Sequence, residues 1–165
     1  MTDGAAEFLE QGGVKLAYRR SEGDADRAGV VWLGGFHSDM LGEKASVLHA
    51  RCREDGRAFL RFDYLGHGES GGAFADGTIG RWRSDALAML DQLTAGPQVL
   101  VGSSMGGWMS LLVALARPER VKALVLLAPA PDFTDKLMWV GFDESQRTQI
   151  KIGRASCRER VSSPV

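Results

Sequence analysis

The stretch that decides the fold is QVLVGSSMGGWMSLLVALA, residues 98–116. Its first part is apolar and predicts a buried strand over 97–101, and its last part predicts an apolar helix over 105–116. Between them, residues 102–106 match the pattern G-x-S-x-G. The pattern alone is a weak signal because glycine and serine are common in loops, but between a strand and a helix it is specific. It predicts a sharp turn that exposes the hydroxyl of Ser104.

The residue types around this serine suit an attack on a carbonyl carbon. Gly102 and Gly106 carry no Cβ, so strand and helix can approach closely. The helix that begins at Met105 would direct backbone N–H groups and a partial positive charge towards an oxyanion formed at Ser104. The alternative interpretation is that Ser104 merely caps this helix.

Working outward, apolar runs and helical patterns alternate along the chain. The segment 7–20 reads as a hairpin around Gly12-Gly13. Strands are expected at 30–33, 58–63 and 121–127, and helices at 39–54, capped by Ser38 or Asp39, and at 78–94. This order predicts an α/β fold with a mostly parallel sheet and helices on both faces. Ligands of such sheets bind beyond the carboxyl ends of the strands.

Composition bounds the function. The chain has 165 residues, a formal net charge of −1 and two cysteines, Cys52 and Cys157. No basic excess is present for binding nucleic acid, and the cysteines are too few for a disulfide scaffold. The first ten residues, MTDGAAEFLE, have no leader pattern, and no apolar run is long enough for a membrane span. We therefore expect a cytoplasmic protein with no nucleic-acid partner and no membrane span.

Three further segments extend the pattern: GGFHSDM (34–40), DYLGHGESGG (63–72) and APAPDF (128–133). With GSSMGGW (102–108), they resemble the α/β-hydrolase family. They are most similar to a bacterial branch related to animal mitochondrial palmitoyl-protein thioesterases and acyl-glucuronide esterases.

This resemblance implies an ester or thioester substrate, an acyl-enzyme on Ser104 and no cofactor. It also implies an oxyanion hole made by the backbone N–H of Met105 and that of Phe36, with Gly35 as the alternative to Phe36. Gly35 and His37 would line the substrate site. No phosphate-binding or dinucleotide fingerprint is present, and no metal-ligand spacing is found.

The acid–base partners are harder to find. In this family the order along the chain is serine, then an acid, then histidine, yet the three histidines, His37, His49 and His67, all precede Ser104. The resemblance makes His67 structural, and His49 reads as a helix residue, so His37 is the remaining substitute for a base. Asp132 follows the strand 121–127 and is a candidate acid, or it caps the segment after Pro131.

One hypothesis unites these features. Residues 1–150 would be the N-terminal portion of an α/β-hydrolase domain that lacks the last strands and helices. Residues 151–165, KIGRASCRERVSSPV, would be a vector-derived or disordered tail. The parent would then be a serine hydrolase and this chain nearly inactive. The alternative is a non-catalytic relative that binds a small molecule or a partner, which would also explain the absent histidine.

Overall fold

The structure is a computed structural model that describes residues 4–133, 141, 143–145 and 147–148. The chain divides into two compact units, Met1–Pro131 and Asp132–Val165. In the second unit, the Arg147 N–H donates to the Asp143 carbonyl at 3.0 Å, the spacing of one helical turn. The tail predicted over 151–165 lies outside the described residues.

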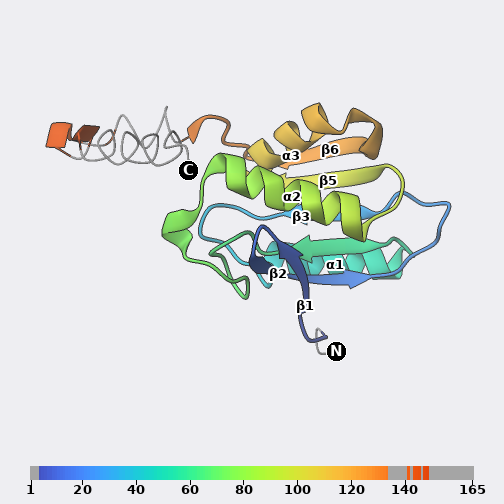
Figure 1. Cartoon of the computed structure of the whole chain (residues 1–165). Coiled ribbons are helices and arrows are strands. Elements are labelled where there is room, and N and C mark those ends of the chain that lie inside the picture. The colour runs from blue at the N-terminus through green and yellow to red at the C-terminus, as the bar shows by residue number, and fades with distance from the viewer. Residues whose placement is uncertain (1–3, 134–140, 142, 146, 149–165) are drawn as a thin grey trace, which may run out of the picture. The chain divides into compact units, whose positions relative to one another are not determined.

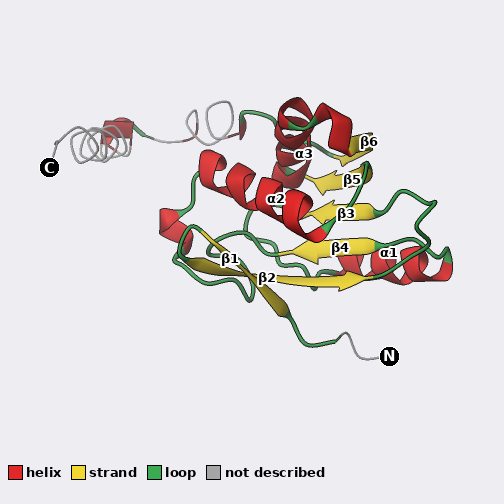
Figure 2. Ribbon diagram, turned by 45° about the vertical axis from the view of Figure 1, so that its right-hand side comes forward, coloured by secondary structure: helices red, strands yellow, loops and turns green. Residues whose placement is uncertain are grey.

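The first unit is built on a six-stranded sheet with the order β1-β2-β4-β3-β5-β6. The strands β3 to β6 are mutually parallel, while β2 runs antiparallel to β1 and β4. Figure 1 and Figure 2 show α2 and α3 on one face of this sheet and α1 on the other. The elements are β1 (Glu7–Gln11), β2 (Val14–Ser21), β3 (Val30–Leu33), α1 (Glu43–Glu54), β4 (Phe59–Phe62), η1 (Phe74–Asp76), α2 (Ile79–Leu93), β5 (Gln98–Ser103), α3 (Met105–Ala116), η2 (Pro118–Arg120) and β6 (Val121–Leu127).

The continuous apolar strands are explained by burial on both faces of the sheet. Every residue of β3 and β4 is buried. Alternate side chains such as Val30, Trp32 and Phe59 pack with Ala45 and Cys52 of α1. The strand residues of opposite parity are also buried because α2 and α3 cover the other face. The predicted α/β class is therefore confirmed.

Several predicted boundaries differ from the structure, most of all the start of α1 and the end of β5. α1 begins at Glu43 with Gly42 as N-cap, so neither Ser38 nor Asp39 caps it. The reason is a local turn, in which Asp39 Oδ1 accepts a hydrogen bond from the Leu41 N–H at 2.8 Å. β5 runs on to Ser103, because it pairs with β6 up to Leu127.

The helix predicted over 78–94 is α2, Ile79–Leu93. Thr78 is its N-cap, since its Oγ1 accepts a hydrogen bond from the Arg81 N–H at 3.0 Å. α3 and β6 have the predicted bounds. In the described part of the chain, no helix combines the length and apolarity that crossing a membrane requires.

Candidate functional site

Ser104 stands in a strained turn between β5 and α3. Its φ and ψ angles are 53° and −117°, and its side chain is exposed. Such a backbone conformation costs energy for a residue with a Cβ and persists only where neighbours hold it. Here the Ser104 N–H donates to the Leu127 carbonyl at 2.9 Å, and its carbonyl accepts from Gly107 at 2.9 Å and Ala130 at 3.2 Å.

The capping interpretation of Ser104 fails in one respect. Ser104 occupies the N-cap position of α3, but its side chain makes no capping hydrogen bond. The Ser104 hydroxyl therefore does not cap the helix, although the Ser104 backbone occupies the N-cap position.

Close backbone contacts explain the glycines of the motif. A Cβ on Gly106 would collide with the carbonyl of Leu33 and lie 2.5 Å from that of Gly34. A Cβ on Gly102 would collide with the Gly106 carbonyl and with Ser110 Oγ. The first turn of α3 is thus pressed against the end of β3, which sets the loop after β3 beside the serine.

That loop carries the other residues predicted for the site. Gly35 is buried, and a Cβ built on it would lie 3.5 Å from Ser104 Cβ and 3.4 Å from the Ser103 carbonyl oxygen. Phe36 is half-buried and His37 is exposed. A pocket of about 190 Å³ opens beside them; it is lined by Trp32, Gly35, Ser38, Asp39, Gly42, Glu43, Lys44, Ala45 and Ser103. Sequence segments some 70 residues apart therefore meet at one edge of the sheet.

The turn after β4 ties these loops together through Asp63. Its Oδ1 accepts from the Met40 N–H at 2.7 Å, and its Oδ2 from the Glu69 N–H at 2.9 Å. Burial raises the pKa of this carboxyl, while the two backbone hydrogen bonds oppose that rise. Ser70 donates to the Asp63 carbonyl at 2.6 Å and accepts from Ala17 at 2.8 Å. The D-x-x-G-H-G-x-S segment is therefore a structural joint.

His67 lies inside this joint and not at the serine. It is buried, and its Nδ1 donates to the Leu65 carbonyl at 3.1 Å. Burial lowers its pKa, which favours the neutral imidazole. Its Nε2 has no hydrogen-bond partner among the described residues. Together with His37, it lines a small pocket of about 120 Å³ between the two loops.

The other two histidines differ in position. His37 stacks on Phe74 with ring centroids 3.8 Å apart. His49 belongs to α1, where it hydrogen-bonds Ser21 Oγ at 3.1 Å and stacks on Phe59. In the described part of the chain, Ser104 Oγ forms no hydrogen bond with an imidazole.

Asp132, the candidate acid, is the first residue of the second unit. It is exposed and has a φ of 54°. The structure therefore places Gly35 beside Ser104 and Met105, with Phe36 and His37 next along the same loop, but gives no such placement for Asp132.

Sequence reasoning missed three residues, Phe74, Trp82 and Asp85, that hold the loops around the site in place. Trp82 Nε1 donates to the Leu65 carbonyl at 3.1 Å, and Asp85 Oδ2 accepts from the Leu65 N–H at 3.0 Å. Phe74 packs on the loop after β3 through both Phe36 and His37. One signal was available for Asp85: it is a carboxylate one residue before Ala86, on the apolar face of the predicted helix.

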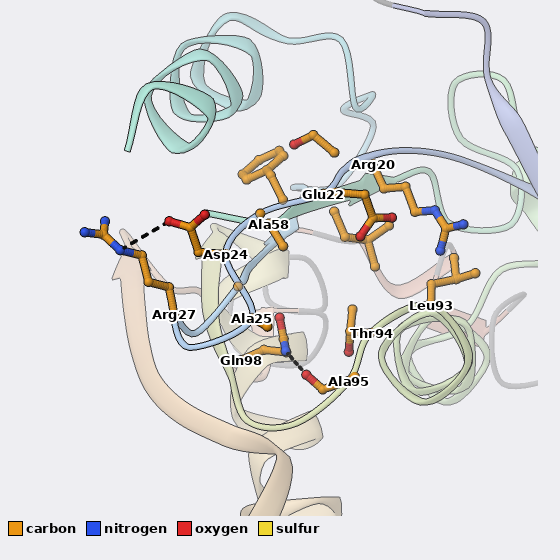
Figure 3. Close-up of a pocket in the computed structure, with 15 residues that line it drawn as sticks. Arg20, Glu22, Asp24, Ala25, Arg27, Ala58, Leu93, Thr94, Ala95 and Gln98 are labelled. Atoms are coloured by element: carbon orange, nitrogen blue, oxygen red, sulfur yellow. Dashed lines mark hydrogen bonds and ion pairs between the residues drawn. The ribbon is translucent and has the colours of Figure 1, made fainter. Parts of the chain in front are cut away.

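A third pocket lies at the opposite edge of the sheet, where β3, β4 and β5 begin. Figure 3 shows it, with a volume of about 270 Å³ and with Arg20, Glu22, Asp24, Arg27 and Gln98 among its lining. Asp24 and Arg27 pair at 3.8 Å, and Gln98 Nε2 donates to the Ala95 carbonyl at 2.7 Å. It lies at the amino ends of the parallel strands, so it is not at the edge where ligands of such sheets bind.

Among the residues that the structure describes, no three histidine, cysteine, aspartate or glutamate side chains are grouped to hold a metal ion.

Known proteins resemble this chain along most of its described length. The mitochondrial palmitoyl-protein thioesterase ABHD10 of Rattus norvegicus is 47% identical over 117 residues, which are 71% of this chain and 39% of that protein. The Mus musculus protein of the same name is 48% identical, with the same coverage.

Solved structures agree with these sequence matches. The alpha/beta hydrolase domain-containing protein 10 from mouse aligns with a TM-score of 0.80 and 39% identity, over 91% of this chain and 59% of that one. A putative hydrolase from Agrobacterium vitis aligns with a TM-score of 0.80 and 38% identity, over 89% and 60%.

The predicted cytoplasmic location is wrong, since the rat and mouse relatives are named mitochondrial. That prediction rested on composition and on the first ten residues, and neither reports on segments beyond the sequence given.

The chain spans about two fifths of the length of the curated relatives it matches. A family model for the alpha/beta hydrolase fold matches residues 41–151. With the sheet order, the turn at Ser104 and the neighbouring loops, this match shows that the chain belongs to the alpha/beta hydrolase fold family.

Proposed function

We propose that the whole protein is a serine hydrolase that cleaves carboxylic ester or thioester bonds through an acyl-enzyme on Ser104. The observation that carries this proposal is the exposed, strained Ser104 between β5 and α3, with its hydroxyl free of the helix cap. A module that only binds has no need of a strained serine at this position. Relatives named palmitoyl-protein thioesterase support a thioester, and the 50% identical Lipase LipV of Mycobacterium tuberculosis, matched over 68 residues, supports an ester.

The reaction has two halves. Ser104 Oγ forms a bond to the acyl carbon while a base takes its proton, and the bond to the alkoxide or thiolate leaving group breaks as that group receives the proton. Water then attacks the acyl-enzyme, which releases the carboxylic acid and restores the serine. No external oxidant, reductant or cofactor enters these steps.

The negative charge of each tetrahedral intermediate needs hydrogen-bond donors fixed in advance. We assign that role to the backbone N–H groups of Met105 and Phe36. Met105 is the first residue of α3, and Gly35 lies so close to Ser104 that a Cβ built on it would be 3.5 Å from Ser104 Cβ. This closeness sets the loop of Phe36 beside the nucleophile. The partial positive charge at the start of α3 adds to the stabilisation.

The acid–base partner is the missing component. No histidine follows Ser104 in this sequence, and His67 is engaged inside the turn after β4. We assign the catalytic histidine to the part of the longer relatives that has no counterpart here. Asp132, which follows β6 in the segment APAPDF, remains the candidate acid. The 165-residue chain by itself should then turn over esters several orders of magnitude more slowly than a complete serine esterase.

A second candidate function is a non-catalytic protein that binds a small molecule or a partner; the lack of a histidine after Ser104 favours it. The decisive experiment extends the reading frame in the source genome and assays the longer protein with p-nitrophenyl and acyl-thioester substrates. The hydrolase predicts an in-frame acid and histidine, turnover, and loss of turnover in Ser104→Ala. A natural stop codon, or a longer protein that shows no turnover, would support the binder. Turnover that survives Ser104→Ala would refute Ser104 as the nucleophile.

A further inference from the structure

The loop after β3 is held in a strained shape. His37 has a φ of 57°, in the left-handed region that side chains with a Cβ avoid. One turn hydrogen bond, from the Ser38 N–H to the Gly35 carbonyl at 3.2 Å, closes this loop. A conformation of this kind persists only where packing determines it. The question is which side chain supplies that packing.

A single aromatic ring contacts two successive side chains of the loop. The ring of Phe74 stacks on His37, with centroids 3.8 Å apart and an interplanar angle of 24°. Phe36 meets the same ring nearly edge-on, at 5.1 Å and 73°. Both are favourable arrangements of aromatic pairs. Phe74 therefore contacts the side chains on either side of the peptide bond between Phe36 and His37.

Phe74 is itself mounted on rigid elements. The Phe74 backbone packs closely against Gly66, since a Cβ built on Gly66 would lie 2.5 Å from Phe74 Cα. Its ring lies 5.7 Å from that of Trp82 in α2. Trp82 Nε1 and the Asp85 carboxylate both bind the backbone of Leu65 in the turn after β4. Phe74 thus connects α2 and the turn after β4 to the loop after β3.

We infer that Phe74 is a positioning residue that fixes the loop of Phe36 and His37 for its work at the serine. The inference rests on the proposed function, in which the Phe36 amide donates to the oxyanion. Phe74 acts on the loop through its ring contacts with Phe36 and His37. Its half-buried ring contacts the rings of Phe36, His37, His67 and Trp82, and none of these four residues belongs to a strand. The loss of the Phe74 ring should therefore loosen the loop more than the sheet.

The first test measures backbone hydrogen exchange in the full 165-residue chain. In Phe74→Ala, peptides that cover residues 34–38 should exchange about tenfold faster, because two aromatic contacts are lost. Phe74→Tyr keeps the ring and should restore slow exchange. Phe8→Ala is the matched control, since it removes a half-exposed ring from β1, which β2 and β4 separate from β3 in the sheet.

The second test measures the slow hydrolysis of p-nitrophenyl acetate by the same chain. Serine hydrolases without a complete triad keep a residual rate that depends on the oxyanion hole and on binding. Phe74→Ala should lower the residual kcat about tenfold and leave KM within about twofold, since an oxyanion donor acts in the transition state. Phe74→Tyr should recover kcat.

The outcomes separate the two proposals. Unchanged exchange at 34–38 in Phe74→Ala, or an equal rise in β3 and α2, overturns the positioning role. Faster exchange confined to the loop with an unchanged kcat supports the positioning role but refutes the oxyanion role of the loop, and with it that part of the proposed function.

Discussion

Replacing Gly106 by alanine tests the backbone contact that sets the serine turn against β3. A Cβ at this position would collide with the Leu33 carbonyl and lie 2.5 Å from that of Gly34. All these neighbours are backbone atoms of a buried strand end, so no flexible side chain can move aside. Overpacking of this kind costs about 1–3 kcal/mol. Because the neighbours are rigid backbone atoms, Gly106→Ala should fall near the upper end of this range and lower the free energy of unfolding by about 2–3 kcal/mol.

Helix propensity acts in the opposite direction. Alanine in place of glycine stabilises a helix by up to about 1 kcal/mol. Gly80→Ala in α2 is therefore the matched control, because the nearest atom to its Cβ would be Thr78 Oγ1 at 3.9 Å. Gly80→Ala should leave stability unchanged or raise it by about 0.5–1 kcal/mol.

The assay is urea unfolding followed by tryptophan fluorescence. With a slope of about 2 kcal/mol per molar urea, Gly106→Ala should lower the midpoint by roughly 1 M. Gly80→Ala should not lower it. If Gly106→Ala were as stable as the unmodified chain, the close approach of α3 to β3 would not exist, and the placement of the loop after β3 beside Ser104 would lose its basis.

Three further predictions concern stability and association. Burial lowers the pKa of His67 below the unfolded value of about 6.5, so the unfolded chain protonates first and stability is lost as pH falls below that value. His67→Gln should therefore lose less stability between about pH 7.5 and pH 5 in urea unfolding; an equal loss would contradict the assignment. Ser104→Gly should have a free energy of unfolding about 1 kcal/mol or more above that of Ser104→Ala, because glycine tolerates the positive φ. It should therefore unfold at higher urea, and equal midpoints would show that no strain is stored at this position. β6 is one of the two edge strands of the sheet in the described part of the chain, and Val125 in it is 45% exposed. Val125→Lys should therefore reduce concentration-dependent light scattering, and unchanged scattering would place association elsewhere.

Local features were legible in the sequence because they depend on neighbours along the chain. The apolar run before Gly102 and the apolar run after Gly106 leave one compact solution, a buried strand turning sharply into a helix. The parallel order of the central strands followed from their uniform apolarity, since a strand without alternation must be covered on both faces. Even here a short polar turn moved a boundary: Asp39 bonds Leu41, and α1 begins only at Glu43.

What stands around the serine was decided only in three dimensions. The contact of Gly35 with Ser104, the grip of Phe74 on His37 and the hydrogen bond of Asp85 to Leu65 join residues 20 to 69 positions apart. Such contacts depend on sheet register, on twist and on the angle at which α2 crosses the strands. None of these is written in the local pattern of apolar and polar residues. The sequence by itself therefore determined the fold and the bend that exposes a hydroxyl, whereas tertiary packing decided which loops, rings and amides face it.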